Sequence, residues 1–357
     1  MSIPTCLQKH LDELYQNSCL GLSDIAHNDI TPYNHADFII KIPYAGKKLK
    51  WDIFFDPEDF TFPPDFDFND DYFLANPDIE MIEKHIPNLG NWNLDNPKML
   101  AIILKEFLEY YKQLQIEKLR KENIYFRYYE EYEKLISGDQ IKAENVEVSV
   151  DGTNITFLIE IKLDLTVLPE YCSDYELNNS DDTILLKIII NKMDGSNTKC
   201  SVQYPLNMEL ILGDHLPLPK FARDVAINEY VSAIKEILMQ RVSEIAENCR
   251  LRKEFMTSLH SLVSLKIVES DTEHFKKLVM LAKNEDYGCL VTTIAGNKFP
   301  QENPAIKLSS VYCQEGKSCN KVLPKFQYNT SLSPDKNAHL LVQSLSQAIC
   351  QLKQHKC

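Results

Sequence analysis

The sequence predicts an α+β protein made of three successive modules, in which antiparallel four-stranded sheets are flanked by helices. Two observations support this fold class. Apolar residues alternate in paired strands in each third of the chain, and each set of strands is followed by a long apolar stripe with helical spacing. The chain of 357 residues is long enough for two or three domains. We expect these modules over residues 1–138, 139–250 and 251–357.

The first module begins with an amphipathic helix at residues 3–15, with Leu7, Leu11 and Leu14 on one face. A hairpin follows, with strands at 38–44 and 49–55, and a Pro-rich loop then leads into a short strand at 65–68. The next helix has capping candidates in Asp95 and Asn96, with Pro97 at its first position. Its apolar pattern continues to about residue 136, or about 58 Å if unbroken, so we expect its second half to pack outside this module.

The other two modules repeat this order. Middle-module strands are expected at 146–150, 155–165, 184–190 and 200–212, with a helix from about 222 to 262. In the C-terminal module, Phe275, Leu278 and Met280 indicate one strand and residues 287–294 its hairpin partner. Ile306 and Leu308 indicate the next strand, and a final helix is expected at 335–352.

The order of elements in residues 38–108 resembles the core of ubiquitin-conjugating enzymes. Those enzymes carry their nucleophilic cysteine between a Pro-Pro strand and a tryptophan, a region marked here by Pro63, Pro64 and Trp92. No cysteine occurs from Gly21 to Tyr171, and the chain lacks the His-Pro-Asn triplet that supplies the oxyanion donor in that family. We therefore expect a vestigial active-site region, no catalytic residue and no enzyme activity.

One thiol leaves an alternative open. Cys319 lies nine residues before Tyr328, close to the spacing from nucleophile to aromatic residue in a conjugating enzyme. It is either a residual thioester nucleophile or an ordinary loop thiol, and the absence of His-Pro-Asn favours the loop thiol. A ubiquitin-conjugating enzyme or variant that uses Cys319 is thus one alternative function, and a ubiquitin receptor is another.

Composition argues against several other classes. No His-x-His or His-Glu-x-x-His occurs, and the glycines form no phosphate loop or dinucleotide fingerprint, so we expect neither a metal nor a cofactor. The net charge is −14, and residues 52–83 hold eleven acidic residues and no Lys or Arg, which disfavours nucleic-acid binding. This stretch is either a solvated loop or a docking surface for a basic partner. Scattered cysteines and the lack of a long apolar run indicate a reducing compartment and no membrane span.

A closer resemblance rests on residues 42–55, Pro63-Pro64-Asp65-Phe66, Asn91-Trp92-Asn93 and Asn96-Pro97, with a weaker match in the C-terminal module. These motifs resemble the BRE (brain and reproductive organ-expressed) family, the subunits with ubiquitin E2-variant (UEV) domains of the BRISC and BRCA-one A deubiquitinase complexes. The resemblance implies UEV domains at both ends, an RWD- or UEV-like middle module, and a non-catalytic scaffold or adaptor.

The same resemblance implies partners. These are a JAMM-type zinc deubiquitinase specific for lysine-63-linked ubiquitin chains, an Abraxas-type scaffold, a von Willebrand A-like subunit, serine hydroxymethyltransferase and polyubiquitin. It further implies a cytoplasmic and nuclear location, with roles in the DNA-damage response, DNA repair, the cell cycle and apoptosis regulation. By analogy with peptide-binding UEV domains, Tyr312, Tyr328 and Pro334 are candidates for a partner-peptide groove; the alternative is that they are core residues.

Overall fold

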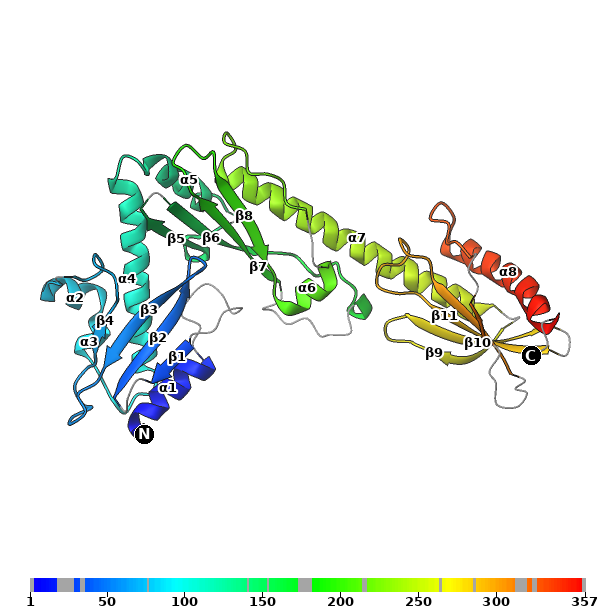
Figure 1. Ribbon diagram of the computed structural model, residues 1–357, viewed down its shortest axis with the longest axis horizontal. Helices are drawn as coiled ribbons and strands as arrows, with labels where there is room; N and C mark the ends of the chain where they lie inside the picture. The colour runs from blue at the N-terminus through cyan, green and yellow to red at the C-terminus, as the bar shows by residue number, and fades with distance from the viewer. Residues whose placement is uncertain are drawn as a thin grey trace. The chain divides into compact units, whose positions relative to one another are not determined.

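The computed structural model describes residues 3–17, 29–32, 36–75, 77–139, 141–152, 154–172, 182–213, 217–262, 265–284, 287–311, 320–322 and 326–354. These residues form three antiparallel sheets accompanied by helices, so the α+β class is confirmed (Figure 1). Contacts divide the chain into two compact units. Unit one comprises Met1–Leu163 and Asn178–Ile237, and unit two comprises Asp164–Leu177 and Leu238–Cys357. Unit one therefore contains the first two sheets.

The first sheet has the order β1-β2-β3-β4. Its strands are β1 (Asp29–Pro32), β2 (Asp37–Tyr44), β3 (Lys47–Phe54) and β4 (Asp65–Asp67). The helices α1 (Thr5–Asn17) and α4 (Met99–Lys121) share one hydrophobic core with this sheet, and the short helices α2 (Ile79–His85) and α3 (Pro87–Gly90) lie between β4 and α4 in the chain. Leu7, Leu11 and Leu14 are at most 3% exposed, as their helical spacing predicts. Ala45 and Gly46 have positive φ angles, which a two-residue hairpin turn requires.

The long helix after the first sheet differs from the prediction in two ways. It begins at Met99, and the side chain of Asn96 accepts a hydrogen bond from the Lys98 amide just before it. It also breaks at Glu122, where the backbone is extended, and a second helix, α5, covers Phe126–Ile136. At this break Tyr125 makes a tertiary contact. Its side chain is buried, and its hydroxyl donates a hydrogen bond to the carbonyl of Gly152 in the middle module.

The middle sheet has the order β5-β6-β7-β8. Its strands are β5 (Val146–Asp151), β6 (Asn154–Lys162), β7 (Thr183–Ile190) and β8 (Thr198–Gln203), with the 3₁₀ turns η1 (Ala143–Asn145) and η2 (Glu170–Cys172). The strand expected at 200–212 ends at Gln203, and its second half is the helix α6 (Leu206–Leu212). Pro205 explains this change, since proline cannot donate to a sheet but suits the start of a helix. Although the helix is shorter than predicted, α4 still packs against β5, outside the first sheet.

The helix α7 covers Ile227–Ser261, so it begins five residues later than expected. The carboxylate of Glu131 accepts a hydrogen bond from the amide of Ile227 at 2.9 Å. This contact satisfies one of the free N–H groups at the start of a helix. It comes from a residue far away in sequence, so local capping signals could not reveal it.

The third sheet, in unit two, has the order β13-β12-β11-β10-β9. The strands are β9 (Leu265–Ser270), β10 (Lys277–Asn284), β11 (Tyr287–Ile294), β12 (Ala305–Ser310) and β13 (Asn320–Val322), and α8 covers Pro334–Gln354. The prediction of four-stranded sheets is therefore wrong here, because this sheet has five strands. The missed edge strand β9 exposes Lys266, Val268 and Glu269, so it lacks a clear apolar alternation. Phe275, expected in a strand, has a positive φ and precedes β10.

Candidate functional site

Packed aromatic side chains fill the region between Pro63 and Trp92, where the sequence predicts a vestigial active site. Pro63 is exposed and Pro64 is buried immediately before β4. Further along, Phe73 is 4% exposed, and its ring contacts those of Trp51, Phe68 and Tyr111 at centroid distances of 6.2, 4.7 and 5.0 Å. The segment therefore contributes hydrophobic packing, and the sequence places no thiol in it.

Trp92 contacts both the loop before Pro63 and the N-terminal helix α1. Its indole Nε1 donates a hydrogen bond to the Phe60 carbonyl at 3.1 Å. Its ring stacks on His10 at 5.0 Å and lies 5.8 Å from Phe55. Trp92 thus joins the loop before Pro63 to α1, which is a structural role.

His10 is a buried titratable group beside Trp92. The residue is fully buried, and its Nε2 lies 2.9 Å from the Leu94 carbonyl, so this nitrogen carries the proton and donates it. Its Nδ1 has no hydrogen-bond partner among the described residues. Burial lowers the pKa of His10, outweighing the nearby carbonyls of Leu94 and Pro97, which act in the opposite direction.

The His10 environment predicts a pH-dependent stability. The folded-state pKa lies below the usual 6.5, so the unfolded chain binds a proton more readily. The stabilisation that His10 contributes is therefore fully present above pH 6.5. Below pH 6.5 the free energy of unfolding decreases, by at most about 1.4 kcal/mol per pH unit. Urea unfolding of the first sheet at pH 7.5 and 5.5 measures the loss. His10→Gln, which cannot titrate, should show a smaller difference; an equal difference in both proteins would exclude His10 as its source.

A cleft of about 1060 Å³ lies in unit one between the β2–β3 hairpin, α4 and the β5–β6 hairpin. Its lining combines aromatic, acidic and basic side chains, among them Tyr44, Tyr72, Phe73, Tyr111, Tyr125, Lys47, Lys118, Lys121, Asp70, Asp71, Glu117, Glu122 and Asp151. Burial raises the pKa of Tyr111 to about 12, with Asp70 adding to the effect. Its phenol therefore stays protonated and can act as a donor.

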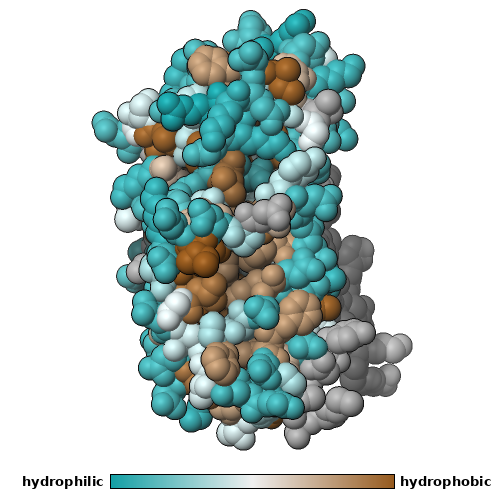
Figure 2. Space-filling model, turned by 90° about the vertical axis from the view of Figure 1, so that its left-hand side faces the viewer, coloured by the Kyte–Doolittle hydropathy of each residue, from teal (hydrophilic) through white to brown (hydrophobic). Residues whose placement is uncertain are grey.

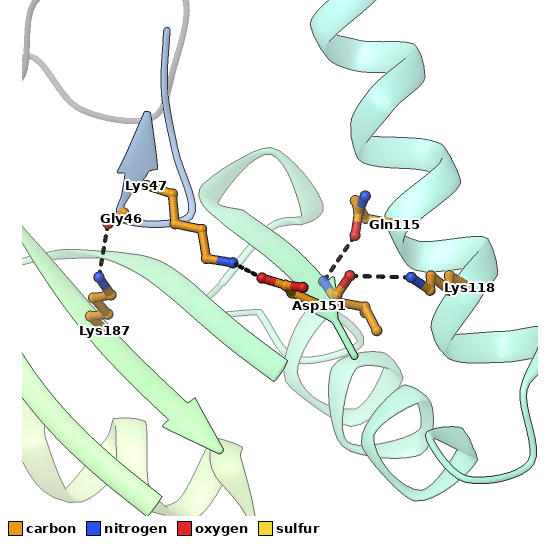
Figure 3. A network of polar contacts seen from close by, with 7 residues as sticks. Gly46, Lys47, Gln115, Lys118, Asp151 and Lys187 are labelled. Carbon is orange, nitrogen blue, oxygen red and sulfur yellow. Dashed lines mark hydrogen bonds and ion pairs between the residues drawn. The ribbon is translucent and has the colours of Figure 1, made fainter. Parts of the chain in front are cut away.

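The tip of the β2–β3 hairpin is held to the middle sheet by two lysines, shown in Figure 3. Lys47 Nζ lies 2.8 Å from a carboxylate oxygen of Asp151. Lys187 Nζ donates to the Gly46 carbonyl at 2.9 Å. The ion pair with Lys47 lowers the pKa of Asp151, but both side chains are largely exposed, so the pair contributes little stability.

The helix α4 is joined to the same strand of the middle sheet. The amide of Val150 donates to Gln115 Oε1 at 2.9 Å, and Lys118 Nζ donates to the carbonyl of Val150 at 3.3 Å (Figure 3). The N–H and the C=O of Val150 in β5 are therefore both hydrogen-bonded to side chains of α4. This arrangement fixes α4 relative to the middle sheet.

Buried contacts complete this joint between the two sheets. Tyr44 donates its hydroxyl proton to the Val148 carbonyl at 2.8 Å, and the Ala45 amide donates to Glu147 Oε2 at 2.6 Å. Glu147 is only 4% exposed. Burial, followed by the charge of Glu147, raises the pKa of Tyr44. Sequence reasoning missed Glu147, because in Val-Glu-Val-Ser-Val it alternates with apolar residues, a pattern that predicts a solvent-facing side chain.

The face of unit one drawn in Figure 2 gathers hydrophobic side chains in its middle, with hydrophilic residues around them. Large apolar side chains of the first module are also exposed: Phe62 is 60%, Tyr72 89% and Ile79 74% exposed. Exposed apolar groups with a polar border are typical of protein-binding surfaces. Unit one therefore offers a candidate contact surface.

The candidate residues of the C-terminal module are not brought together in the described chain. Tyr328 is 7% exposed, and its ring packs on Phe255 and Phe299 at 5.3 and 4.6 Å. Pro334 instead lines a hollow of about 570 Å³, which Tyr328 does not line. Tyr312 and Cys319 lie outside the described residues.

The described residues contain no group of three or more His, Cys, Asp or Glu side chains placed to hold a metal ion. Within the same residues, no helix has both the length and the apolar character needed to cross a membrane.

Comparison with known proteins identifies the family. The model of the family described as brain and reproductive organ-expressed protein (BRE) matches residues 3–314. This chain belongs to the BRE family. The match covers the first two sheets and most of the strands of the third.

Curated relatives cover most of this BRE-family chain. A protein of Danio rerio named "BRISC and BRCA1-A complex member 2" is 28% identical over 332 residues, which is 88% of this chain and 83% of the relative. A protein of the same name from Branchiostoma floridae is 26% identical over 284 residues, 77% of this chain and 71% of the relative. The similarity thus extends across both compact units.

Proposed function

We propose that this chain is a non-catalytic scaffold subunit of complexes of the BRISC and BRCA1-A kind. The observation that carries the proposal is the name of its relatives, "BRISC and BRCA1-A complex member 2", together with similarity over 88% of this chain and 83% of the Danio rerio protein. The family match over residues 3–314 supports it. Members of one family with collinear similarity commonly occupy the same place in an assembly.

Two features support a scaffold rather than an enzyme. The vestigial region from Pro63 to Trp92 has no cysteine to carry ubiquitin as a thioester, and Phe73 packs into the core within it. The joint between the first two sheets, built around Tyr44 and Glu147, holds unit one together through buried hydrogen bonds. A stiff frame with exposed apolar side chains suits a subunit that positions others.

The proposal extends to the architecture and partners. The modules are UEV-like at both ends with an RWD- or UEV-like module between them, over residues 1–138, 139–250 and 251–357. The chain bridges a core of two proteins to a von Willebrand A-like subunit. The core consists of a JAMM-type zinc deubiquitinase, which cleaves lysine-63-linked chains, and an Abraxas-type scaffold. Serine hydroxymethyltransferase and polyubiquitin are further partners, and the complexes act in the cytoplasm and the nucleus, including in DNA repair.

A second part of the proposal places a partner's peptide tail in the C-terminal module, around Tyr312, Tyr328 and Pro334. The hollow beside Pro334 offers room, with Arg250, Lys253 and Glu254 in its lining. Since Tyr328 is part of the core, the suitable variant is Tyr328→Phe, which keeps the ring and removes only a hydroxyl that has no partner among the described residues. The double variant Tyr312→Ala/Tyr328→Phe should bind the partner's tail peptide more weakly, as measured by fluorescence polarisation. Unchanged binding by the folded double variant would exclude this groove.

The direct experiment is mass spectrometry of proteins that co-purify with the tagged full chain from its own cells. We expect a JAMM protease and an Abraxas-type scaffold at an abundance comparable to that of the chain. Recovery of a ubiquitin-activating enzyme or a ligase without any protease would contradict the scaffold proposal. It would favour the alternative in which Cys319 accepts ubiquitin.

A further inference from the structure

Unit two contains a pair of neighbouring thiols that the proposed function does not use. Cys172, in η2, and Cys249, on α7, are 77 residues apart in sequence, and their Sγ atoms lie 2.9 Å apart. Both are free cysteines. Cys249 is 3% exposed and Cys172 is half-buried, so the pair lies just beneath the surface.

A buried arginine lies beside one of these sulfurs. Arg252 is 1% exposed, and its guanidinium donates from Nη2 to Cys249 Sγ at 3.8 Å. Its Nε donates to the His274 carbonyl at 3.1 Å, and Nη1 donates to the Gly296 carbonyl at 3.5 Å. Two carbonyls thus hold the cation in place beside the sulfur. A fixed positive charge beside a thiol favours the thiolate.

We propose that Cys172 and Cys249 form an oxidation site that reacts with hydrogen peroxide to give a reversible intramolecular disulfide. The geometry assigns the two roles: Cys249, beside Arg252, is the attacking thiolate, and Cys172 is the resolving thiol. The protonation pattern agrees. The contact with Cys172, helped by Arg252, lowers the pKa of Cys249 against the effect of burial. The contact with Cys249 and burial raise the pKa of Cys172. Hydrogen peroxide is close to water in size, and the partial exposure of Cys172 gives it access to the pair.

The chemistry balances in two steps. The Cys249 thiolate attacks one oxygen of hydrogen peroxide, the O–O bond breaks, and the leaving hydroxide takes up a proton to give water and a sulfenic acid on Cys249. Cys172 then attacks that sulfur, its thiol proton leaves with the hydroxyl as a second water, and the S–S bond forms. Two thiols are oxidised and one peroxide is reduced. In a reducing compartment, cellular thiols restore the pair.

Cys200 and Cys289 are two further cysteines of the described chain with which the pair can be compared. Burial raises the pKa of Cys200 and of Cys289, the latter to about 11. Among the described residues, neither thiol has a second sulfur or an arginine beside it. They therefore serve as internal references of similar burial but lower reactivity.

The test is a peroxide titration of the reduced full chain, followed by non-reducing peptide mapping with mass spectrometry. We expect a peptide pair joined through Cys172 and Cys249, formed about tenfold or more faster than oxidation of Cys200 or Cys289, and reversed by dithiothreitol. In Cys172→Ser, Cys249 should accumulate as a sulfenic acid that dimedone traps. Cys200→Ser is the matched control and should form the same cross-link as the unmodified chain.

Two results would overturn the proposal. The first is a folded chain in which Cys200 and Cys289 oxidise while no Cys172–Cys249 peptide pair forms. The second is a Cys172→Ser variant whose Cys249 takes up no more dimedone than Cys289. Circular dichroism of each variant establishes that it is folded, so loss of structure cannot produce either result.

Discussion

Replacing Trp51 with alanine is expected to destabilise unit one by about 3–5 kcal/mol. Trp51 is 1% exposed and lies among the rings of Phe68, Phe73 and Phe107, at centroid distances of 5.1, 6.2 and 6.4 Å. Alanine would leave a cavity among rings that cannot easily move together. Denaturant unfolding, followed by tyrosine and tryptophan fluorescence and by circular dichroism, measures the loss.

The matched control for Trp51→Ala is Phe62→Ala. Phe62 is another aromatic residue of the first module, but it is 60% exposed. Its removal should change the free energy of unfolding by only about 0.5 kcal/mol. Equal effects of the two substitutions would mean that the aromatic cluster around Trp51 is not the core of the first sheet.

The second large effect is expected from Glu147→Ala, at the joint between the first and middle sheets. The carboxylate accepts from the Ala45 amide at 2.6 Å, and Ala45 itself is fully buried. Removing it leaves a buried N–H without its acceptor, which costs about 1–3 kcal/mol, or more where the lost acceptor is charged. The free energy of unfolding should fall accordingly, and hydrogen exchange at the Ala45 amide should quicken.

Two controls separate this buried contact from the surface charges near it. Glu147→Gln keeps an acceptor oxygen, so it should lose less stability than Glu147→Ala. Lys47→Ala removes a partner of Asp151 in an exposed ion pair and should cost less than about 1 kcal/mol, with a smaller effect at high salt. If Lys47→Ala were as damaging as Glu147→Ala, the joint would depend on its surface ion pair.

Elements with strong local patterns could be predicted from the sequence. The amphipathic spacing of Leu7, Leu11 and Leu14 gave the first helix, and the alternation on either side of Ala45 and Gly46 gave the first hairpin. The residues 287–294 form β11 with the bounds that their pattern indicates. In each case one face is buried, so local sequence and tertiary packing favour the same structure.

Elements that depend on distant residues could not be predicted in the same way. Tyr125 packs where the long helix breaks, and Glu131 bonds the first amide of α7; both contacts join segments far apart in sequence. The edge strand β9 was missed because it exposes Val268, and edge strands need not alternate. The absence of a cysteine between Pro63 and Trp92 is visible in the sequence alone, whereas the pairing of Cys172 with Cys249 required the fold.

We propose that this chain assembles a deubiquitinase without contributing chemistry. The most direct measurement is cleavage of lysine-63-linked tetraubiquitin by the assembly purified through the tagged full chain, compared with the assembly purified through Cys319→Ser. The scaffold account predicts equal cleavage by both assemblies, abolished by a zinc chelator. Cleavage or ubiquitin transfer that requires Cys319, with a reductant-sensitive ubiquitin adduct on the chain, would contradict it.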